Sequence, residues 1–493
     1  MLKEDLLDKS EQVLTRLIEK LYLAENALPK QQLVQELQIS LSTLNRYGRH
    51  LQEDLQAYEP TRTASLMDTG TTLQFNTKGQ LSVEQFITET YVQKSINYRL
   101  LVLIYQQPGI SMFNLANGLN ISEASLYRRL KQIRPILAEF KLTVQNGQLI
   151  GSELQVRYFY YCLFGLSSYP VASTPAVHDF IHCLQEELGF TFSKSARRHV
   201  NRWLQISNRR ARQSVDMDST IPTHIRELYQ NNVLYGKVQH CFQQFFKVTR
   251  PFEVESLCTM LISLAVFNSK NQVVSRFSLI NRKNQTRLNQ IVRHIEAEFF
   301  AALKITSDEW SFELSKFLFD ICARPYCFTG TISNFDQQYA QYYETTIFSA
   351  NVSQLVNVIH DRLLKSSRPQ LRNLVQNNWL YFDQSFHLVL REFQYQQRRE
   401  IFVGLDTNLN AHLERILREE LEQQFRTDLN VIVMLYQPGY AYDLVVTNTA
   451  TSAYDDADRT YWIANLGNQS DIKNIHDLIH QNYYDGLALE RHS

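Results

Sequence analysis

The sequence Leu115-Ala-Asn-Gly-Leu-Asn-Ile-Ser-Glu-Ala-Ser-Leu-Tyr-Arg128 has the same pattern as Leu33-Val-Gln-Glu-Leu-Gln-Ile-Ser-Leu-Ser-Thr-Leu-Asn-Arg46, which lies 82 positions earlier. In each copy two Leu four residues apart mark one face of a helix, and a buried Ile and a Ser lead into a second helical segment. The Ser is expected to accept a hydrogen bond from the free N–H groups of the helix it opens. Two short helices joined by a tight turn form a helix-turn-helix, whose second helix enters the DNA major groove. A single copy could equally be a plain helical hairpin packed in a core. Two copies in register favour the helix-turn-helix.

Both copies are followed by a hairpin pattern. After the second copy, residues 141–150 read as two short strands around Asn146-Gly147, a strong hairpin signal. After the first copy, Thr71–Leu81 is a second candidate hairpin. A helix-turn-helix with a hairpin is a winged helix. The sequence therefore predicts two tandem winged helices, in modules that span residues 1–88 and 89–167.

The charges of the two modules differ. Residues 94–157 hold eight Lys and Arg against three Glu, whereas residues 1–93 hold nine Lys and Arg against thirteen Asp and Glu. Because phosphate neutralisation supplies most of the nonspecific affinity for double-stranded DNA, the second module is expected to dominate binding. The first module could read bases, support dimerisation or orient the duplex. The candidate DNA-binding residues are Ser125, Tyr127, Arg128, Arg129, Lys131, Gln132 and Arg134 in the second copy, and Thr43, Asn45, Arg46 and Arg49 in the first.

The whole-chain composition fits a multi-domain protein of the reducing cytoplasm. The 493 residues carry no net charge, so a DNA-binding surface requires local segregation of charge. Six scattered Cys form no metal-binding spacing and are expected to be free thiols. The longest apolar run, Leu257–Phe267, is too short to span a bilayer, and the N-terminus does not resemble a signal peptide. No phosphate-binding Gly loop or nucleophile elbow occurs, so neither an enzyme nor a cofactor is expected.

The middle of the chain is amphipathic, helical and weakly repeated. The segment His178–Leu188 resembles Asn289–Phe299, which suggests two helical domains spanning about 172–285 and 286–395. The stretch Ser193–Arg212 has seven basic residues and no acid, which is either a solvated helix face or an anion-binding face. A neutral His can accept a phosphoryl group, and neighbouring Arg would stabilise its charge. The candidate phosphorylation sites are His199, His182 and His294, with His360 a weaker one.

The last hundred residues predict a small α/β domain, 398–493. Short apolar segments alternate with helical ones, as in a parallel sheet covered by helices. Residues 396–493 hold eight Lys and Arg against fifteen Asp and Glu, so this domain suits protein contacts rather than DNA. Its first helix has a wide apolar stripe formed by Leu413, Ile416, Leu417 and Leu421. Part of the stripe must cover the domain's own sheet, and we expect the rest to join the chain into a homodimer or a higher homo-oligomer.

This order of parts resembles the Mga/AtxA group of global virulence regulators of Gram-positive bacteria. The resemblance rests on Tyr91–Leu101, similar to the family's linker helix, on Leu149–Phe159, and on His199–Arg212, similar to its regulatory-domain signature. It implies a transcriptional regulator, expected to be an activator, that links gene expression to carbohydrate status. It also implies two helical domains of the phosphotransferase-system regulation type (PRD), phosphorylated on His by sugar-uptake phosphocarriers. The C-terminal domain would be similar to sugar-transport enzyme IIB and serve self-association.

The chain departs from these parent patterns in two places. Enzyme IIB carries its phosphoryl group on a Cys after the first strand, whereas the corresponding segment here, Val403–Asn410, contains no Cys. In the second helical domain the position matching His199 is expected near Glu313, where a fixed charge could resemble a phosphorylated state. The alternative function is a phosphoryl-relay component of the sugar phosphotransferase system. The missing Cys and the doubled helix-turn-helix favour the DNA-binding regulator.

Overall fold

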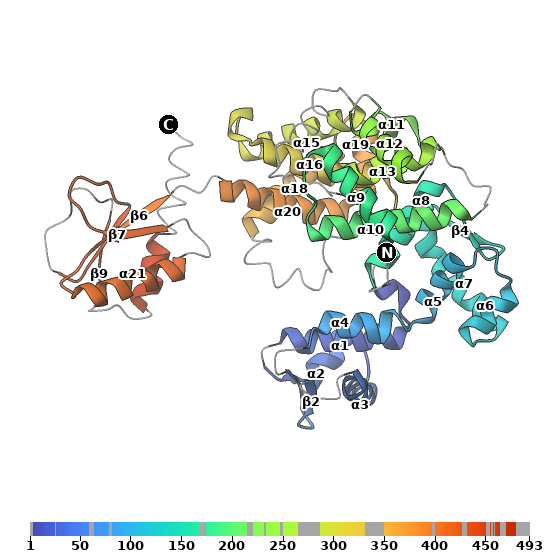
Figure 1. The fold of residues 1–493 in the computed structure, drawn as a ribbon. Helices are drawn as coiled ribbons and strands as arrows, with labels where there is room; N and C mark the ends of the chain where they lie inside the picture. Colours follow the sequence, from blue (N-terminus) through green and yellow to red (C-terminus); the bar gives the residue numbers. More distant parts are fainter. Residues whose placement is uncertain are drawn as a thin grey trace. The chain divides into compact units, whose positions relative to one another are not determined.

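The structure of the chain is a computed structural model. It describes residues 3–24, 26–58, 64–77, 81–167, 169, 174–213, 220–230, 233–246, 250–264, 286–330, 350–396, 400–425, 431–449, 454, 457, 459–463 and 470–479. The chain divides into two compact units, Met1–Val389 and Leu390–Ser493, each described by itself (Figure 1). The first three expected domains lie in the first unit, and the fourth, 286–395, extends a few residues beyond its end; the borders between the four stay predictions. No helix among the described residues has the length and apolar character needed to cross a membrane.

The first copy of the repeated pattern folds as α2 (Lys30–Leu37) and α3 (Leu41–Tyr58). The 3-10 helix η1 (Glu4–Leu6) and α1 (Lys9–Leu23) precede this pair. Strands β1 (Leu28–Pro29), β2 (Ala64–Asp68) and β3 (Thr72–Thr77) form an antiparallel sheet in the order β1-β3-β2. The hairpin β2–β3 thus begins earlier than the predicted stretch Thr71–Leu81, which supplies only its second strand, and residues 78–80 lie outside the described residues. The prediction placed the turn too late, because Gly70 makes it: its φ is +92°, and its N–H donates to Asp68 Oδ1.

The second copy folds as α6 (Met112–Leu119) and α7 (Glu123–Glu139), followed by the hairpin of β4 (Thr143–Gln145) and β5 (Gln148–Ile150). The hairpin predicted around Asn146-Gly147 is confirmed. The first helix of each copy ends in the same way: Gln38 after α2 and Asn120 after α6 both adopt the left-handed conformation. The Leu at 33, 37 and 44 and those at 115, 119 and 126 are all buried. The plug residues Ile39 and Ile121, expected to be buried, are only half-buried.

Short helices connect the copies to each other and to the rest of the unit. Between the copies lie α4 (Val83–Ile87), a π-helical turn η2 (Thr88–Val92) and α5 (Ile96–Gln106). After β5 the chain enters α8 (Glu153–Gly165), which is buried along almost its whole length. Because α8 has few exposed positions, it acts as a core helix between the second copy and the helices that follow.

The middle of the chain consists of two successive sets of helices. The first set is α9 (Pro175–Leu188), α10 (Lys194–Arg212), α11 (Thr223–Arg226), α12 (Val233–Phe245) and α13 (Pro251–Ser263). The second set is α15 (Arg287–Leu303), η3 (Ser307–Glu309), α16 (Phe312–Cys327), α18 (Ala350–Leu364), α19 (Pro369–Asn377) and α20 (Trp379–Gln396). Helix α13 packs against α16, which joins the two sets.

The helix caps relate these sets and correct one sequence alignment. Thr174 and Thr286 cap α9 and α15, and Ser193 and Ser311 cap α10 and α16, each by accepting a backbone N–H bond. This agreement supports the predicted repeat. Counted from its cap, however, His199 corresponds to Phe317 rather than to Glu313, which lies one turn earlier. The sequence comparison that placed the match near Glu313 is therefore one helical turn out of phase, because amphipathic helices match nearly as well after a shift of four residues.

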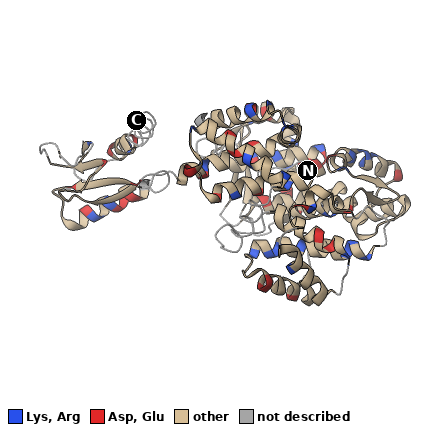
Figure 2. Ribbon diagram, turned by 90° about the horizontal axis from the view of Figure 1, so that it is seen from above, with Lys and Arg blue, Asp and Glu red and all other residues tan. Residues whose placement is uncertain are grey.

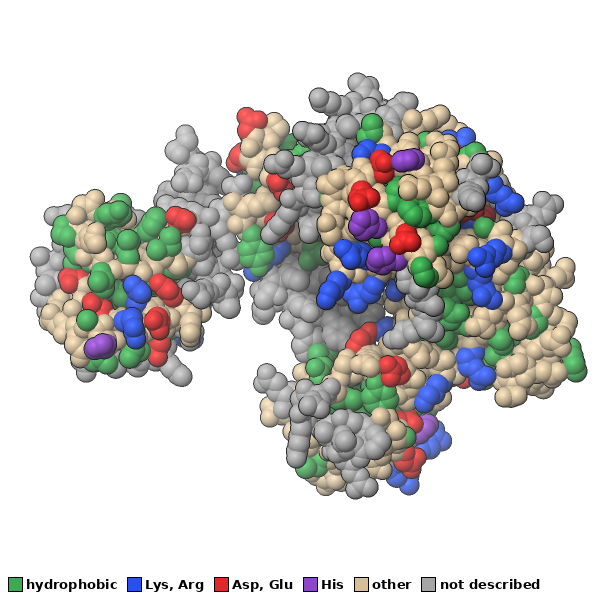
Figure 3. Space-filling model, in the orientation of Figure 1, with side chains coloured by type: hydrophobic (Ala, Val, Ile, Leu, Met, Phe, Trp, Pro, Cys, Tyr) green, Lys and Arg blue, Asp and Glu red, His purple; other side chains and the backbone are tan. Residues whose placement is uncertain are grey.

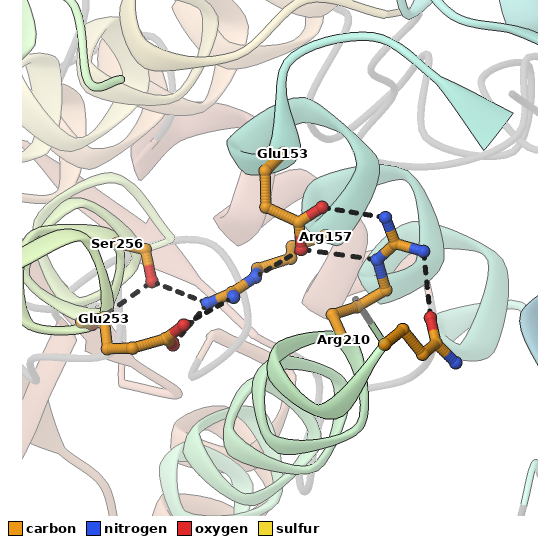
Figure 4. A network of polar contacts seen from close by, with 6 residues as sticks. Glu153, Arg157, Arg210, Glu253 and Ser256 are labelled. Atoms are coloured by element: carbon orange, nitrogen blue, oxygen red, sulfur yellow. Dashed lines mark hydrogen bonds and ion pairs between the residues drawn. The ribbon is translucent and has the colours of Figure 1, made fainter. Parts of the chain in front are cut away.

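A buried network of charges holds α8 to the first set of helices (Figure 4). Arg157 donates to both carboxylate oxygens of Glu253 on α13, at 2.6 and 2.8 Å, and through Nε to Glu153 at 2.9 Å. Arg210 of α10 donates to the other oxygen of Glu153 at 2.8 Å. All four residues are buried. Although burial opposes the charged form, the carboxylates of Glu253 and Glu153 raise the pKa of Arg157 above its ordinary value, so Arg157 stays charged.

The C-terminal unit contains a fully parallel sheet in the order β7-β6-β8-β9. Its strands are β6 (Ile401–Asp406), β7 (Val431–Leu435), β8 (Leu444–Thr447) and β9 (Thr460–Trp462), with α21 (Ala411–Phe425) after β6. Leu417 and Leu421 of α21 and Ile475 of the helical segment 470–479 join the strands in one apolar cluster. The predicted small parallel α/β domain is confirmed, except that residues 464–469 and 480–493 lie outside the described residues.

We expect Glu253→Ala to destabilise the first unit by about 3–5 kcal/mol, because Arg157 would stay buried without its bidentate partner. Glu4→Ala is the matched control, since Glu4 pairs with Arg16 where both side chains are partly exposed, and such pairs contribute about 0–1 kcal/mol. Urea denaturation measures the free energy of unfolding of both variants, and hydrogen exchange of peptides from α8 and α13 measures the local loss of stability. Equal effects of the two substitutions would contradict the structural role of the network.

Candidate nucleic-acid interface

Helix α7 presents one exposed face because its other face is fixed in the core. The Ser122 hydroxyl accepts a hydrogen bond from the Ser125 N–H at 3.2 Å, which confirms the predicted cap. Leu126, Ile133 and Leu137 are buried, at the spacing of one helical stripe. The opposite positions therefore face away from the core, as a helix that enters a DNA groove requires.

The exposed face of α7 carries three cations and an aromatic ring. Arg128, Lys131 and Arg134 are exposed, and the Tyr127 side chain is 58 % exposed. Arg128 donates to the Ser125 hydroxyl at 2.9 Å, which extends the guanidinium along the helix surface. Within the described part of the chain no ion pair engages Lys131 or Arg134. This face holds the cations that can neutralise phosphates.

Arg129 points away from this face. Its guanidinium forms an ion pair with Asp8, the residue that precedes α1, and also contacts Gln132 Oε1 at 3.2 Å. The side chain of Arg129 is only 19 % exposed. Arg129 thus fastens the N-terminal segment to α7 instead of facing solvent with its neighbours, and it holds Gln132 beside it. No local pattern predicts this pairing, because Asp8 and Arg129 lie 121 residues apart.

The hairpin β4–β5 is fixed by its turn. Asn146 and Gly147 have φ values of +47° and +68°, as a type I′ turn requires. The Gly147 carbonyl accepts a hydrogen bond from Gly109 at 3.1 Å, and a Cβ on Gly147 would lie 1.9 Å from the Ile110 carbonyl oxygen. The α5–α6 loop therefore holds the turn of the hairpin, and only glycine fits this contact.

In the first copy, fewer polar side chains of the second helix, α3, are available to contact DNA. Arg46 and Arg49 are exposed, but the Asn45 side chain accepts a hydrogen bond from buried Lys30 at 2.8 Å. Lys30 also bonds Asp68 of the hairpin. The Thr43 hydroxyl lies 2.8 Å from the Ser40 hydroxyl. Of the four candidate residues, Arg46 and Arg49 are exposed cations, although Arg49 also donates to the Asn45 carbonyl at 3.4 Å, whereas the side chains of Asn45 and Thr43 have partners within the copy.

Charge counting along the sequence overstated the basic surface of the second module. Two of its eight cations, Arg129 and Arg157, are paired with carboxylates, and Arg157 is buried. Acidic and basic residues are interspersed along much of the ribbon (Figure 2). The cations of α7 are hence a local feature of one helix face rather than part of a broad basic surface.

The His candidates have different surroundings. His199 on α10 is half-buried, and its Nδ1 lies 2.6 Å from the Tyr161 hydroxyl. Burial lowers the pKa of His199 below its ordinary value, and the charges of Arg202 and Arg198 act in the same direction. His199 is therefore neutral at neutral pH, with one ring nitrogen engaged. His360 stacks on Trp379 with the ring centroids 3.5 Å apart.

His182 is the most accessible candidate. Its side chain is 63 % exposed, and its Nδ1 lies 3.4 Å from Glu186. It lines a small hollow of about 200 Å³ between α9 and α10, together with His178, Arg197 and Arg198. Figure 3 shows His side chains over α9, with Lys and Arg beside them. By contrast, His294 uses Nδ1 to bond the Gln290 carbonyl of its own helix at 2.6 Å.

The described residues contain no cluster of three or more His, Cys, Asp or Glu that could hold a metal ion. All six Cys are free thiols in the structure. Burial raises the pKa of Cys258, Cys322 and Cys327 above the usual range of a thiol, which disfavours the reactive thiolate.

Comparison with known families identifies the second copy. Residues 80–164 match the family model of the Mga helix-turn-helix domain. The matched segment runs from just before α4 into α8, so it contains α6, α7 and the hairpin β4–β5. No curated protein sequence matches the chain. The family match supports DNA binding and transcription regulation by this segment.

We expect Lys131→Ala with Arg134→Ala to weaken binding to all DNA sequences and to lower the slope of log K against log salt by about two, one for each lost phosphate contact. Arg129→Ala is the matched control, because it also removes one cation from α7 but not from the exposed face. Mobility-shift titrations at several salt concentrations measure both slopes. If Arg129→Ala lowers the slope as much as Arg134→Ala alone, the assignment of the exposed face is wrong.

Proposed function

We propose that this chain is a DNA-binding transcriptional activator that contacts DNA through two tandem winged helices. The observation that carries the proposal is the exposed cationic face of α7, in the segment that matches the Mga helix-turn-helix domain. The first copy supports it, because its caps, turn and buried Leu repeat those of the second copy at a constant offset. The second winged helix supplies most of the affinity, and the first contributes Arg46 and Arg49.

A footprint of the full chain on genomic fragments tests this function. We expect protection of discrete sites and increased transcription in vitro from the promoters beside them. Replacing Arg46 and Arg49 with Ala should weaken binding less than replacing Lys131 and Arg134. Uniform binding without discrete protected sites would contradict a regulator, and the reverse order of the two double variants would exchange the roles of the copies.

We further propose that the two sets of helices are phosphotransferase-system regulation domains that sense carbohydrate status. Phosphocarrier proteins would phosphorylate His182, which is supported by its exposure and by Arg197 and Arg198 at the same hollow. In the C-terminal unit the segment after β6 contains Asn410, whose side chain caps α21 by accepting two N–H bonds. This segment contains no Cys at the place where enzyme IIB carries its phosphoryl group, which favours a regulator without catalytic activity over a phosphoryl-relay component.

Incubation with phosphoenolpyruvate and the general phosphocarriers should place an acid-labile phosphoryl group on the chain. We expect His182→Ala to remove most of this label, whereas His294→Ala, on the matching helix of the second set, should retain it. Label that persists in His182→Ala but disappears in His199→Ala would move the site to α10. Onward transfer of the label to a sugar-transport protein would favour the phosphoryl-relay alternative.

We also propose that the C-terminal unit joins the chain into at least a homodimer. Leu417 and Leu421 of the predicted stripe are buried against the unit's own sheet, whereas the Ile416 side chain is 46 % exposed. Leu435, Tyr440 and Trp462 are further large apolar side chains that this unit exposes. Exposed apolar groups of this size support a protein–protein contact.

Removal of residues 397–493 should shift the chain towards monomer in sedimentation experiments. The double variant Ile416→Lys with Trp462→Lys should do the same in the full chain, because two charges would have to be desolvated in the contact. An unchanged oligomer in both cases would place assembly in the first unit.

A further inference from the structure

A hollow of about 550 Å³ lies between α10, the C-terminal end of α5 and the chain that follows α8. This volume is in the range of sites that bind small molecules. Its described lining residues are Tyr105, Gln106, Pro108, Phe164, Tyr169, Thr174, Arg202, Gln205, Ile206, Asn208, Arg209, Arg212 and Gln213. They include three Arg and neither Asp nor Glu.

The three Arg come from one face of α10 and differ in how they are held. Arg202 is half-buried, its guanidinium lies over the Tyr161 ring, and its Nε is buried without a hydrogen-bond partner in the described part of the chain. Arg209 donates to the carbonyls of Gln106 at 2.6 Å and Tyr105 at 3.4 Å. Arg212 is exposed at the rim. Arg202 and Arg212 bring two guanidinium groups to the lining of the hollow, where an anion could accept charge-assisted hydrogen bonds from them.

The remaining wall of the hollow is aromatic and amide-rich. Phe164 and Tyr169 stack with centroids 4.1 Å apart, and Tyr105 packs edge-on against Phe164. Gln205, Asn208 and Gln213 supply neutral donors and acceptors at the same site. Guanidinium groups facing a flat apolar wall suit a molecule that has an anionic group at one end and a ring at the other.

We propose that this hollow binds a small phosphorylated ring compound, which acts as an effector of DNA binding. A bounded hollow of this size admits a nucleotide or a sugar phosphate but not a duplex. Both of these ligands share the phosphate that Arg202 and Arg212 would hold. The class of ligand follows from the hollow itself, whereas the effect on DNA rests on the proposed function.

The hollow is directly connected to the hairpin of the second copy. Arg209 and Gln213 hold the carbonyl of Tyr105 at the end of α5, and Pro108 of the α5–α6 loop lines the hollow. The next residue, Gly109, donates to Gly147 in the turn of the hairpin. A ligand that orders this loop would therefore change the position of the hairpin, and so the affinity for DNA.

Calorimetric titration of the full chain with AMP, glucose 6-phosphate and inorganic phosphate tests the site. We expect one of the two ring compounds to bind at least tenfold more tightly than inorganic phosphate. Tight binding of AMP would identify a nucleotide as the ligand, and tight binding of glucose 6-phosphate would identify a sugar phosphate. Arg202→Met and Arg212→Gln should each weaken that binding about tenfold or more, as expected for a lost charge-assisted hydrogen bond. Arg197→Gln, on the same helix but outside the hollow, should leave it unchanged. Arg212→Gln keeps the test valid if Arg202→Met does not fold.

The saturating ring compound should change the DNA dissociation constant at least fivefold, and this change should disappear in Arg212→Gln. DNA affinity of the ligand-free Arg212→Gln variant should equal that of the parent. If none of the three compounds binds, or if inorganic phosphate binds as tightly as both ring compounds, the proposal is wrong while DNA binding remains. If instead ligand-free Arg212→Gln binds DNA more weakly with a smaller salt slope, the hollow contacts DNA and not a small molecule.

Discussion

The bidentate pair between Arg157 and Glu253 is the constraint on which the first unit depends. Both groups are withdrawn from water, so separating them would leave Glu253 without its ion-pair partner in the interior and Arg157 with Glu153 alone. Glu153 and Arg210 extend the pair to α10, and together the four residues bind three helices that are distant in the sequence. Helix α8, which follows the second helix-turn-helix copy, is thus held to α10 and α13 by buried ion pairs that are costly to separate.

Helix α10 shows how one basic helix can serve several purposes. Arg210 points into the buried network, Arg202, Arg209 and Arg212 line the hollow beside α5, and Arg197 and Arg198 lie near His182. The helical period distributes these cations over three faces, so that adjacent residues such as Arg209 and Arg210 have unrelated surroundings. Helix α10 thus contacts both α8, through Arg210 and Glu153, and the C-terminal end of α5, through Arg209.

The two helix-turn-helix copies have one backbone design and different electrostatics. Their left-handed turns and Ser caps fall at the same offset, because these features require specific local chemistry. Their polar side chains diverged: Asn45 is held by Lys30, whereas Lys131 and Arg134 of α7 remain exposed. This difference supports a division of work in which α7 binds phosphates and α3 has a smaller part.

The sequence alone was enough to predict what depends on neighbours within a few residues. The paired helices, their Ser caps, the turn at Asn146-Gly147 and the alternation of strand and helix after residue 400 all follow from local periodicity and turn chemistry. Only the tertiary structure decided which cations are available to bind DNA. Arg129 forms an ion pair with Asp8, and Arg157 forms one with Glu253, and each pair joins residues more than ninety positions apart. It also decided the site beside α5, since a hollow arises from the packing of three segments and leaves no pattern in any one of them. Helix caps, turns and apolar periodicity determine the backbone because they involve residues within about one helical turn of each other. The environment of a long side chain, by contrast, depends on the distant segment that packs beside it.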